Sequence, residues 1–261
     1  MLVSEVMLQQ TQASRVMLTF EALIARFHDV VSLAAAPRAD VLRAWGRLGY
    51  PRRAVALHRA AREMVQRHAG TVPRDPVELR ALPGVGDYTS ASVASLAYGV
   101  PVAALDTNVR RVWARVDHGA EPDEVADPLL RRAATDWLDP RRSADWNQAV
   151  MDLGREVCRP APRCDECPLR PWCGFAASGR AGRPSTRRRP RFEGSLRQVR
   201  GATLAVLCDR SPRTLGGIAR ATGFPTERVA QAVRGLDRDG VLVASSAASS
   251  GHDRGLVSLP D

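Results

Sequence analysis

The stretch LPGVGDYTSASV, residues 82–93, decides the fold of this chain. It predicts a short helix that ends at Leu82, a tight Pro-Gly-x-Gly turn, and a new helix that begins near Asp87. Gly84 and Gly86 permit unusual φ angles and allow a partner to approach the backbone closely. Because the first N–H groups of a helix have no partner within it, the start of the second helix is a ready site for an anion.

Two helices joined by such a turn form a helix-hairpin-helix, which binds a phosphate of the DNA backbone without reading the base sequence. We expect this motif to span about residues 79–98 and to contact DNA through Gly84, Val85 and Gly86. The alternative is an ordinary turn between helices, but the L-P-G-V-G pattern is specific enough to disfavour it.

Composition and charge also indicate a nucleic-acid partner. The chain has 261 residues, of which 44% are hydrophobic, enough for two or three domains. It carries 38 Lys and Arg against 28 Asp and Glu, a net charge of +10, and all 38 basic residues are arginine. Arginine suits phosphate because its planar fork donates hydrogen bonds in pairs. A bias toward arginine explains the absence of lysine but not the excess of positive charge.

The sequence shows no sign of export or membrane insertion. Residues 1–12 lack the basic region and the small-residue cleavage site of a signal peptide, and no apolar run is long enough to span a membrane. We therefore expect a cytoplasmic protein, associated with the bacterial nucleoid and without a membrane partner.

Helical periodicity dominates the chain up to about residue 155 and predicts an all-α body over residues 1–157. The predicted helices are 2–12, 15–27, 39–46, 51–69, 75–81, 87–98, 107–117, 124–138 and 144–157. A cysteine-rich loop follows at 158–175, and the basic, Gly/Pro/Ser-rich residues 176–195 are typical of a flexible linker.

The last part, residues 196–261, is expected to form a small α+β domain that resembles a winged helix. Its pattern predicts helices at 196–208, 214–222 and 226–239, followed by two short strands in VLVAS and GLVSLP. Winged helices often bind DNA through the third helix, which here carries Arg228, Arg234 and Arg238, but they also serve as protein-interaction modules. The sequence leaves both interpretations open.

Clustered thiols indicate a metal site rather than a disulfide framework, because the chain shows no export signal. The cluster has the pattern C-x5-C-x2-C-x5-C and consists of Cys158, Cys164, Cys167 and Cys173. Four thiolates this close bind either a [4Fe–4S] cluster or tetrahedral zinc. Zinc ribbons usually place two C-x2-C pairs far apart, so the single compact loop favours the iron–sulfur cluster.

Two carboxylates stand out by their positions. In SEVMLQQTQ, residues 4–12, Glu5 is the one ionisable side chain of a stretch that is otherwise apolar or polar and uncharged. In ALDTNVRRVWARV, Asp106 stands just before an amphipathic helix, where an aspartate is ordinarily an N-cap. Cleavage of glycosidic bonds commonly uses one protonated acid and one ionised carboxylate, so the two residues form a candidate catalytic pair.

The motifs together resemble the helix-hairpin-helix DNA glycosylases with an iron–sulfur cluster, most closely the MutY-type adenine glycosylases. The motifs that carry the resemblance, in the family's order and spacing, are SEVMLQQTQ, GRLGY (46–50), LPGVGDYT, DTNVRRV and WNQAVMDLG (146–154). The resemblance covers residues 2 to about 175. It implies a monomeric enzyme that hydrolyses the N-glycosidic bond of adenine mispaired with 8-oxoguanine or guanine in double-stranded DNA.

The resemblance also implies roles for single residues. Glu5 would be the general acid that protonates the flipped adenine, and its burial would raise its pKa into a useful range. Asp106 would stay ionised and stabilise the oxocarbenium-like sugar. Tyr88 and Asn108 match positions that support the two carboxylates by hydrogen bonding.

Further matches concern the DNA and the mode of cleavage. Gln10 and Leu48 match residues that enter the duplex where the base has been extruded, with simple packing as the alternative. Endonuclease III-type relatives have a nucleophilic lysine at the position of Tyr88. Because this chain has tyrosine there and no lysine elsewhere, the resemblance implies a monofunctional glycosylase.

The chain departs from the family in its cysteine spacing and its C-terminal part. The first cysteine spacing is one residue shorter than usual, and the shorter winged-helix-like segment replaces the domain that recognises 8-oxoguanine.

Two alternative functions stay open. One is a thymine or uracil mismatch glycosylase of the same fold, against which Glu5 argues. The other is a non-catalytic iron–sulfur DNA-binding or regulatory protein, against which the presence of both Glu5 and Asp106 argues.

Overall fold

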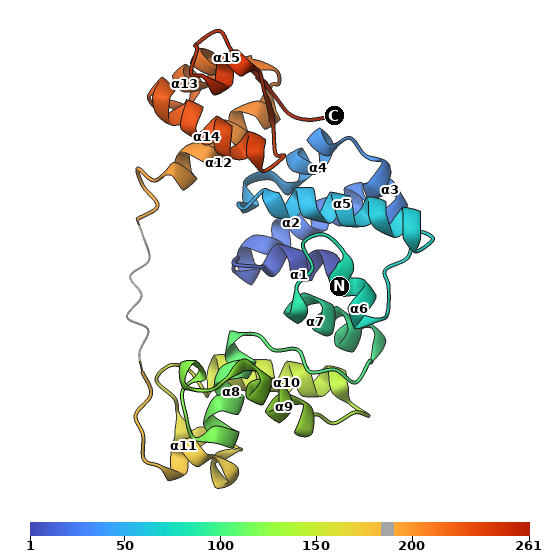
Figure 1. Cartoon of the computed structure of the whole chain (residues 1–261), viewed down its shortest axis with the longest axis vertical. Helices are drawn as coiled ribbons and strands as arrows, with labels where there is room; N and C mark the ends of the chain where they lie inside the picture. The colour runs from blue at the N-terminus through green and yellow to red at the C-terminus, as the bar shows by residue number, and fades with distance from the viewer. Residues whose placement is uncertain (184–190) are drawn as a thin grey trace. The chain divides into compact units, whose positions relative to one another are not determined.

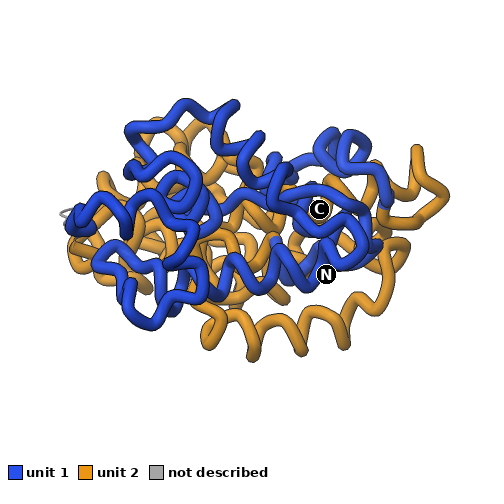
Figure 2. Tube along the Cα trace, turned by 90° about the horizontal axis from the view of Figure 1, so that it is seen from below, with its two compact units in different colours: residues 1–5, 73–188 blue, residues 6–72, 189–261 orange. Residues whose placement is uncertain are grey.

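The computed structural model describes residues 1–183 and 191–261, which form a helix-dominated fold (Figure 1). The chain divides into two compact units, one made of residues 1–5 and 73–188 and the other of residues 6–72 and 189–261 (Figure 2). The division falls within the first helix, α1 (Leu2–Leu8), which therefore contributes residues to both units. Of the predicted linker, residues 184–190 lie outside the described residues.

The first unit contains the hairpin and the cysteine-rich loop. Its helices are α6 (Pro76–Ala81), α7 (Asp87–Tyr98), α8 (Thr107–His118), α9 (Asp127–Asp136), α10 (Ser143–Glu156) and α11 (Gly174–Ala177), with 3-10 turns η2 (Pro122–Glu124), η3 (Cys164–Glu166) and η4 (Arg170–Trp172). Apolar residues of α8, α9 and α10 form a common core with Trp113, whose ring stacks on that of Trp137 at a centroid distance of 5.5 Å. This packing fixes α8, the helix that Asp106 caps.

The second unit combines N-terminal helices with the C-terminal segment. Its elements are α2 (Ala13–Arg26), α3 (Val30–Ala35), α4 (Arg38–Trp45), η1 (Gly46–Leu48), α5 (Arg52–Arg67), α12 (Leu196–Asp209), β1 (Arg213–Thr214), α13 (Leu215–Thr222), α14 (Thr226–Arg238), β2 (Val243–Ala244), α15 (Ser246–Ser249) and β3 (Leu256–Ser258). The strands form an antiparallel sheet in the order β1–β3–β2. In its register, Val257 pairs with both Arg213 and Ala244.

The C-terminal segment packs on α4 and α5 of the same unit. The Ala39 N–H donates to the carbonyl of Pro260 at 3.0 Å, and Arg43 Nε donates to the carbonyl of Cys208 at 3.3 Å. At the end of α14, the Asp239 carboxylate pairs with Arg200 of α12 and with Arg52 of α5. Hydrogen bonds and ion pairs therefore join the segment to the N-terminal helices of its own unit.

Two of the arginines of α14 each donate one hydrogen bond within the C-terminal segment, residues 191–261. Arg228 donates to the carbonyl of Gly194 at 2.6 Å, and Arg234 donates to that of Ser249 at 3.0 Å. Arg238 at the end of the helix is exposed. A guanidinium has five N–H donors, so these single contacts leave most donors of Arg228 and Arg234 for other partners, and both interpretations of the helix stay open.

The structure differs from the sequence-based expectations at several element boundaries. Helix α1 ends at Leu8 rather than at residue 12, and α3 was not predicted, although Asp29 and Ser32 form a capping box at its start. Two strands were predicted, but the sheet has three. The additional strand, β1, has two residues, which is too short for an alternating pattern to appear in the sequence. Helix α15, which was not predicted, lies between the two predicted strands, with Ser245 as its N-cap.

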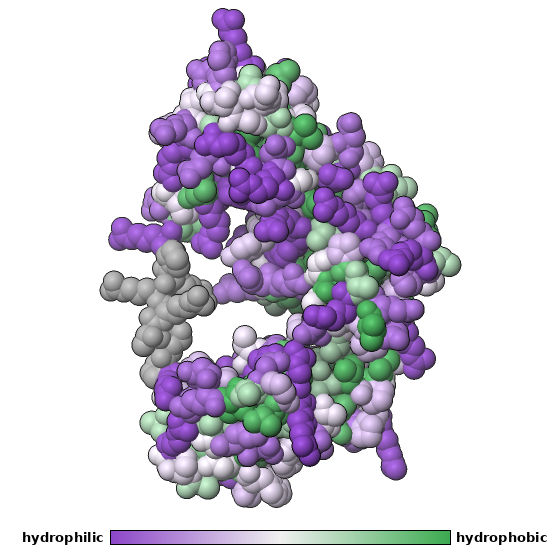
Figure 3. Space-filling model, viewed as in Figure 1, coloured by the Kyte–Doolittle hydropathy of each residue, from purple (hydrophilic) through white to green (hydrophobic). Residues whose placement is uncertain are grey.

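None of the helices within residues 1–183 and 191–261 is both long and apolar enough to cross a membrane. The face drawn in Figure 3 is largely hydrophilic, and its hydrophobic residues occur in scattered patches.

Candidate active site

The first carboxylate of the site, Glu5, lies within α1 and is buried, with 9% of its surface exposed. Burial raises the pKa of Glu5 above its usual value, and the charge of Asp106 raises it slightly further. The hydroxyl groups of Tyr88 and Ser92 act in the opposite direction. These two residues stand four positions apart on α7, so they share one helical face. The net result is a carboxyl group that keeps its proton to a higher pH than a free glutamate.

The second carboxylate, Asp106, is the N-cap of α8. Its Oδ1 accepts hydrogen bonds from the backbone N–H groups of Asn108 at 2.8 Å and Val109 at 2.7 Å. Its Oδ2 accepts from Asn108 Nδ2 at 2.8 Å. These three hydrogen bonds hold the Asp106 carboxylate in one orientation at the start of α8.

The phenol of Tyr88 is a neutral group in this environment. Its burial, and secondly the charge of Glu5, raise its pKa well above the usual value. The hydroxyl donates to Met151 Sδ at 3.5 Å. Tyr88 therefore supplies a hydroxyl beside Glu5 and offers no nucleophile.

A chain of hydrogen bonds connects Asp106 to the cysteine loop through Arg111, which sequence reasoning missed. The Arg111 guanidinium donates to Asn108 Oδ1 at 2.9 Å and, through Nε, to the carbonyl of Cys158 at 2.6 Å. It also donates to the carbonyl of Gly154 at 2.7 Å. A Cβ atom at Gly154 would lie 2.7 Å from Asn108 Cβ, so glycine is required where α10 passes α8.

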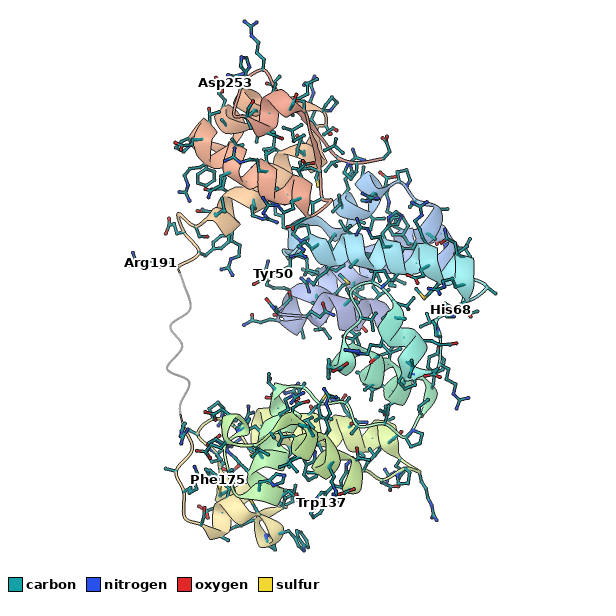
Figure 4. All side chains as sticks on the ribbon, in the orientation of Figure 1. Tyr50, His68, Trp137, Phe175, Arg191 and Asp253 are labelled. Carbon is teal, nitrogen blue, oxygen red and sulfur yellow. The ribbon has the colours of Figure 1, made fainter. Side chains whose placement is uncertain are left out.

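The four clustered thiols line one pocket, together with apolar residues of α8 and α10 and with Arg115. They are free thiols in the structure. Arg115, which is 1% exposed, donates to Cys158 Sγ at 3.7 Å and pairs with Glu121 at 2.8 Å. Its guanidinium also lies 4.7 Å from the ring of Phe175, which Figure 4 labels. Burial has the larger effect on the Cys158 thiol and raises its pKa overall, whereas Arg115 lowers that pKa.

The donor set of this pocket is four thiols, which suits an iron–sulfur cluster or a zinc ion. Within residues 1–183 and 191–261, no group of three or more His, Cys, Asp or Glu side chains is placed to hold a metal ion. An iron–sulfur cluster takes each thiolate at a different iron, so its ligands stand further apart than those of one tetrahedral zinc. The four cysteines that line the pocket are the donors that either group would take.

The hairpin turn has the geometry that its glycines predict. Gly84 has a φ of 79°, and the Val85 N–H donates to the carbonyl of Leu82 at 3.1 Å. Gly86 is the N-cap of α7, and a Cβ there would meet no atom within 4 Å. The start of α7 is therefore open to a phosphate group. Asp87, the first residue of α7, is paired with Arg80 and Arg131, which offset its negative charge near this turn.

The two residues predicted to enter DNA differ in exposure. Gln10 follows α1 at a φ of 56° and is exposed, whereas Leu48 is 4% exposed and belongs to the core. The exposed apolar group of this turn is Tyr50, which is 42% exposed at a φ of 48° and is labelled in Figure 4. Sequence reasoning missed Tyr50, although it is the aromatic residue that ends the GRLGY motif.

Comparison with known proteins places this site in a family. Residues 3–134 match the HhH-GPD superfamily of base excision DNA repair proteins. The chain belongs to this family. The match confirms the predicted helix-hairpin-helix glycosylase fold and identifies the chain as a base excision repair glycosylase.

Several relatives of this family member are named adenine DNA glycosylase. The one from Mycolicibacterium smegmatis is 45% identical over 210 residues, which cover 80% of this chain and 71% of the relative. The one from Mycobacterium tuberculosis (strain H37Rv) is 42% identical over 233 residues, covering 87% of this chain and 72% of the relative. The human protein of that name is 39% identical over 175 residues, covering 66% of this chain and 32% of its own length.

Solved structures of similar fold include a thermostable thymine-DNA glycosylase, with a TM-score of 0.63 and 26% identity over 68% of this chain and 83% of that one. A trapped endonuclease III–DNA covalent intermediate has a TM-score of 0.60 and 25% identity, covering 68% of this chain and 84% of that one.

Replacing Ser92 by alanine is expected to raise the pKa of Glu5, because the Ser92 hydroxyl now lowers it. The alkaline limb of the pH profile of base release, where the acid loses its proton, should then move to higher pH. Single-turnover rates from about pH 5 to about pH 9 measure this shift. Ser90→Ala, on the same helix but bonded to the Asp87 carbonyl, is the control, and an unmoved limb in Ser92→Ala would contradict the assignment.

Proposed function

We propose that this chain is an adenine DNA glycosylase that removes adenine mispaired with 8-oxoguanine or guanine from double-stranded DNA. The observation that carries the proposal is the pair of unlike carboxyl groups, Glu5 buried with a raised pKa and Asp106 held by three N–H donors. The similarity to proteins named adenine DNA glycosylase supports the choice of base.

The two carboxyl groups divide the chemistry between them. Glu5 gives its proton to a ring nitrogen of the extruded adenine, so that the base leaves with the electron pair of the glycosidic bond. Asp106 stays ionised and stabilises the positive charge that develops on the sugar. A water molecule then adds to the sugar carbon and releases a proton, which restores the acid at Glu5.

Adenine requires this acid more than a pyrimidine does, because protonation turns a poorly leaving purine into a neutral leaving group. The likeness to a solved thymine-DNA glycosylase makes a thymine mismatch the second candidate substrate. The higher identity to the adenine glycosylases and the buried acid at Glu5 favour adenine.

Duplexes that contain adenine opposite 8-oxoguanine, guanine or thymine, together with thymine opposite guanine, test the substrate directly. We expect release of adenine opposite 8-oxoguanine and opposite guanine, because a mispaired base is extruded from the duplex more easily than a correctly paired one and can then reach Glu5. Release of thymine alone would establish the second candidate and exclude adenine as the substrate.

We further propose that Cys158, Cys164, Cys167 and Cys173 hold a [4Fe–4S] cluster. When bound, the cluster would crosslink the loop. The hydrogen bonds of Arg111 to the Cys158 carbonyl and to Asn108, which in turn bonds Asp106, connect the loop to the candidate site. Zinc is the competing occupant.

Purified protein is therefore expected to be brown, with about four irons and four sulfides per chain. Cys167→Ser should lose the metal and bind duplex DNA more weakly, because the loop loses a ligand. Cys208→Ser is the matched control, since Cys208 lies outside the cysteine pocket and contacts the Leu42 carbonyl instead. Stoichiometric zinc without sulfide would refute the cluster.

We also propose that the enzyme is monofunctional, because Tyr88 is a neutral phenol and the chain contains no lysine. Arginine stays protonated and cannot form a Schiff base with the sugar. The product is expected to be an intact abasic strand that breaks on later treatment with alkali. Borohydride trapping measures this, and a covalent protein–DNA adduct in good yield would overturn the prediction.

A further inference from the structure

Arg53 of α5 is a buried cation, 9% exposed, that lies at the C-terminal end of α1. Its Nη1 donates to the carbonyl groups of Val6 at 3.0 Å and Met7 at 2.7 Å in the last turn of α1, and to that of Gln9, just after the helix, at 2.6 Å. The end of a helix carries partial negative charge, so a guanidinium there is favourably placed. Burial lowers the pKa of Arg53 to about 10, which still leaves it charged at neutral pH.

The other side of the same guanidinium contacts the GRLGY turn. Arg53 Nη2 donates to the Gly49 carbonyl at 3.1 Å and to Thr11 Oγ1 at 3.0 Å. The rings of Trp45 and Tyr50 lie 5.2 Å and 5.5 Å from its central carbon. One side chain thus joins the segment after α1 to the turn between η1 and α5.

Both segments contain residues in a conformation that favours glycine. Gln10 has a φ of 56° and Tyr50 a φ of 48°, which non-glycine residues hold only when surrounding contacts impose it. Gln10 stands between Gln9 and Thr11, whose oxygens accept from Arg53, and Tyr50 follows Gly49, whose carbonyl does the same. Arg53 is the common donor of those contacts.

We propose that Arg53 is a positioning residue. It holds residues 9–11 and Tyr50 in the conformation in which Gln10 and Tyr50 both enter the duplex when adenine is extruded. This inference rests on the proposed function, because it assigns these two exposed residues to the opened DNA stack. A lysine keeps the charge but lacks the planar fork, so it cannot hold both segments at once.

The test compares wild type with Arg53→Lys on two duplexes, one with adenine opposite 8-oxoguanine and one with adenine opposite a reduced abasic site. The second duplex has no base opposite the adenine, so insertion of Gln10 and Tyr50 should contribute less to extrusion of the adenine there. Single-turnover release of adenine from the paired duplex should fall roughly tenfold or more, as expected for a misplaced binding group, and by much less from the unpaired one. Arg52→Lys, whose side chain is 73% exposed, is the matched control.

Unstacking itself is measured separately, through the fluorescence of 2-aminopurine placed beside the adenine. Wild type and Glu5→Gln should both increase it, and Arg53→Lys should not. An equal loss of release on the two duplexes, or an increase in fluorescence with Arg53→Lys as large as that with wild type, would overturn the positioning role. Failure of wild type to release adenine would instead refute the proposed function, while the fluorescence comparison still decides the role of Arg53.

A milder variant guards against a failure to fold. Thr11→Val removes one acceptor of Arg53 while preserving side-chain shape, and it should show a smaller loss with the same preference for the paired duplex. Circular dichroism and thermal unfolding establish that each variant is folded, and a Thr11→Val protein with uniform loss on both duplexes would also contradict the inference.

Discussion

Burial of the Glu5 carboxyl group is the constraint on which the candidate site depends. A buried carboxylate loses its hydration, so the protein favours the protonated form and the pKa of Glu5 rises. The sign for stability follows from the same shift. Because the folded-state pKa lies above the unfolded one, the free energy of unfolding decreases as the pH rises above the ordinary value and through the raised one. Glu5 therefore lowers the stability of the fold near neutral pH, a cost that is expected for a residue retained for catalysis rather than for packing.

In the proposed mechanism Asp106 has to stay ionised, and its environment differs from that of Glu5. The hydrogen bonds that it accepts at the start of α8 come from groups that are fixed by the helix itself and by Asn108. Asn108 is in turn fixed by Arg111, which also holds the Cys158 carbonyl. Two carboxyl groups in unlike surroundings are the usual means by which one site supplies both a proton and a stabilising charge.

The sequence predicted those parts of the site that local chemistry determines. The L-P-G-V-G turn, the N-cap aspartate and the cysteine spacing are short-range patterns, and the structure has the hairpin, the cap and the shared cysteine pocket. Arg53 and Arg111 escaped notice because their roles arise only when helices distant in sequence pack together. Composition made this harder, since with 38 arginines in the chain no single one stands out.

Exposure within the GRLGY motif does not follow from the sequence. Leu48 and Tyr50 stand two residues apart in one motif, yet one side chain enters the core and the other stays at the surface. Gly46 and Gly49 have φ angles of 54° and 88°, and helical periodicity does not apply to a turn with such angles.

The most direct test of the central claim is single-turnover adenine release by Glu5→Gln on a duplex with adenine opposite 8-oxoguanine, measured beside duplex binding. The substitution removes the proton donor and preserves the shape of the side chain. The account predicts that release is abolished while the dissociation constant for the duplex stays near that of wild type. Release at the wild-type rate would contradict the assignment of Glu5 as the general acid.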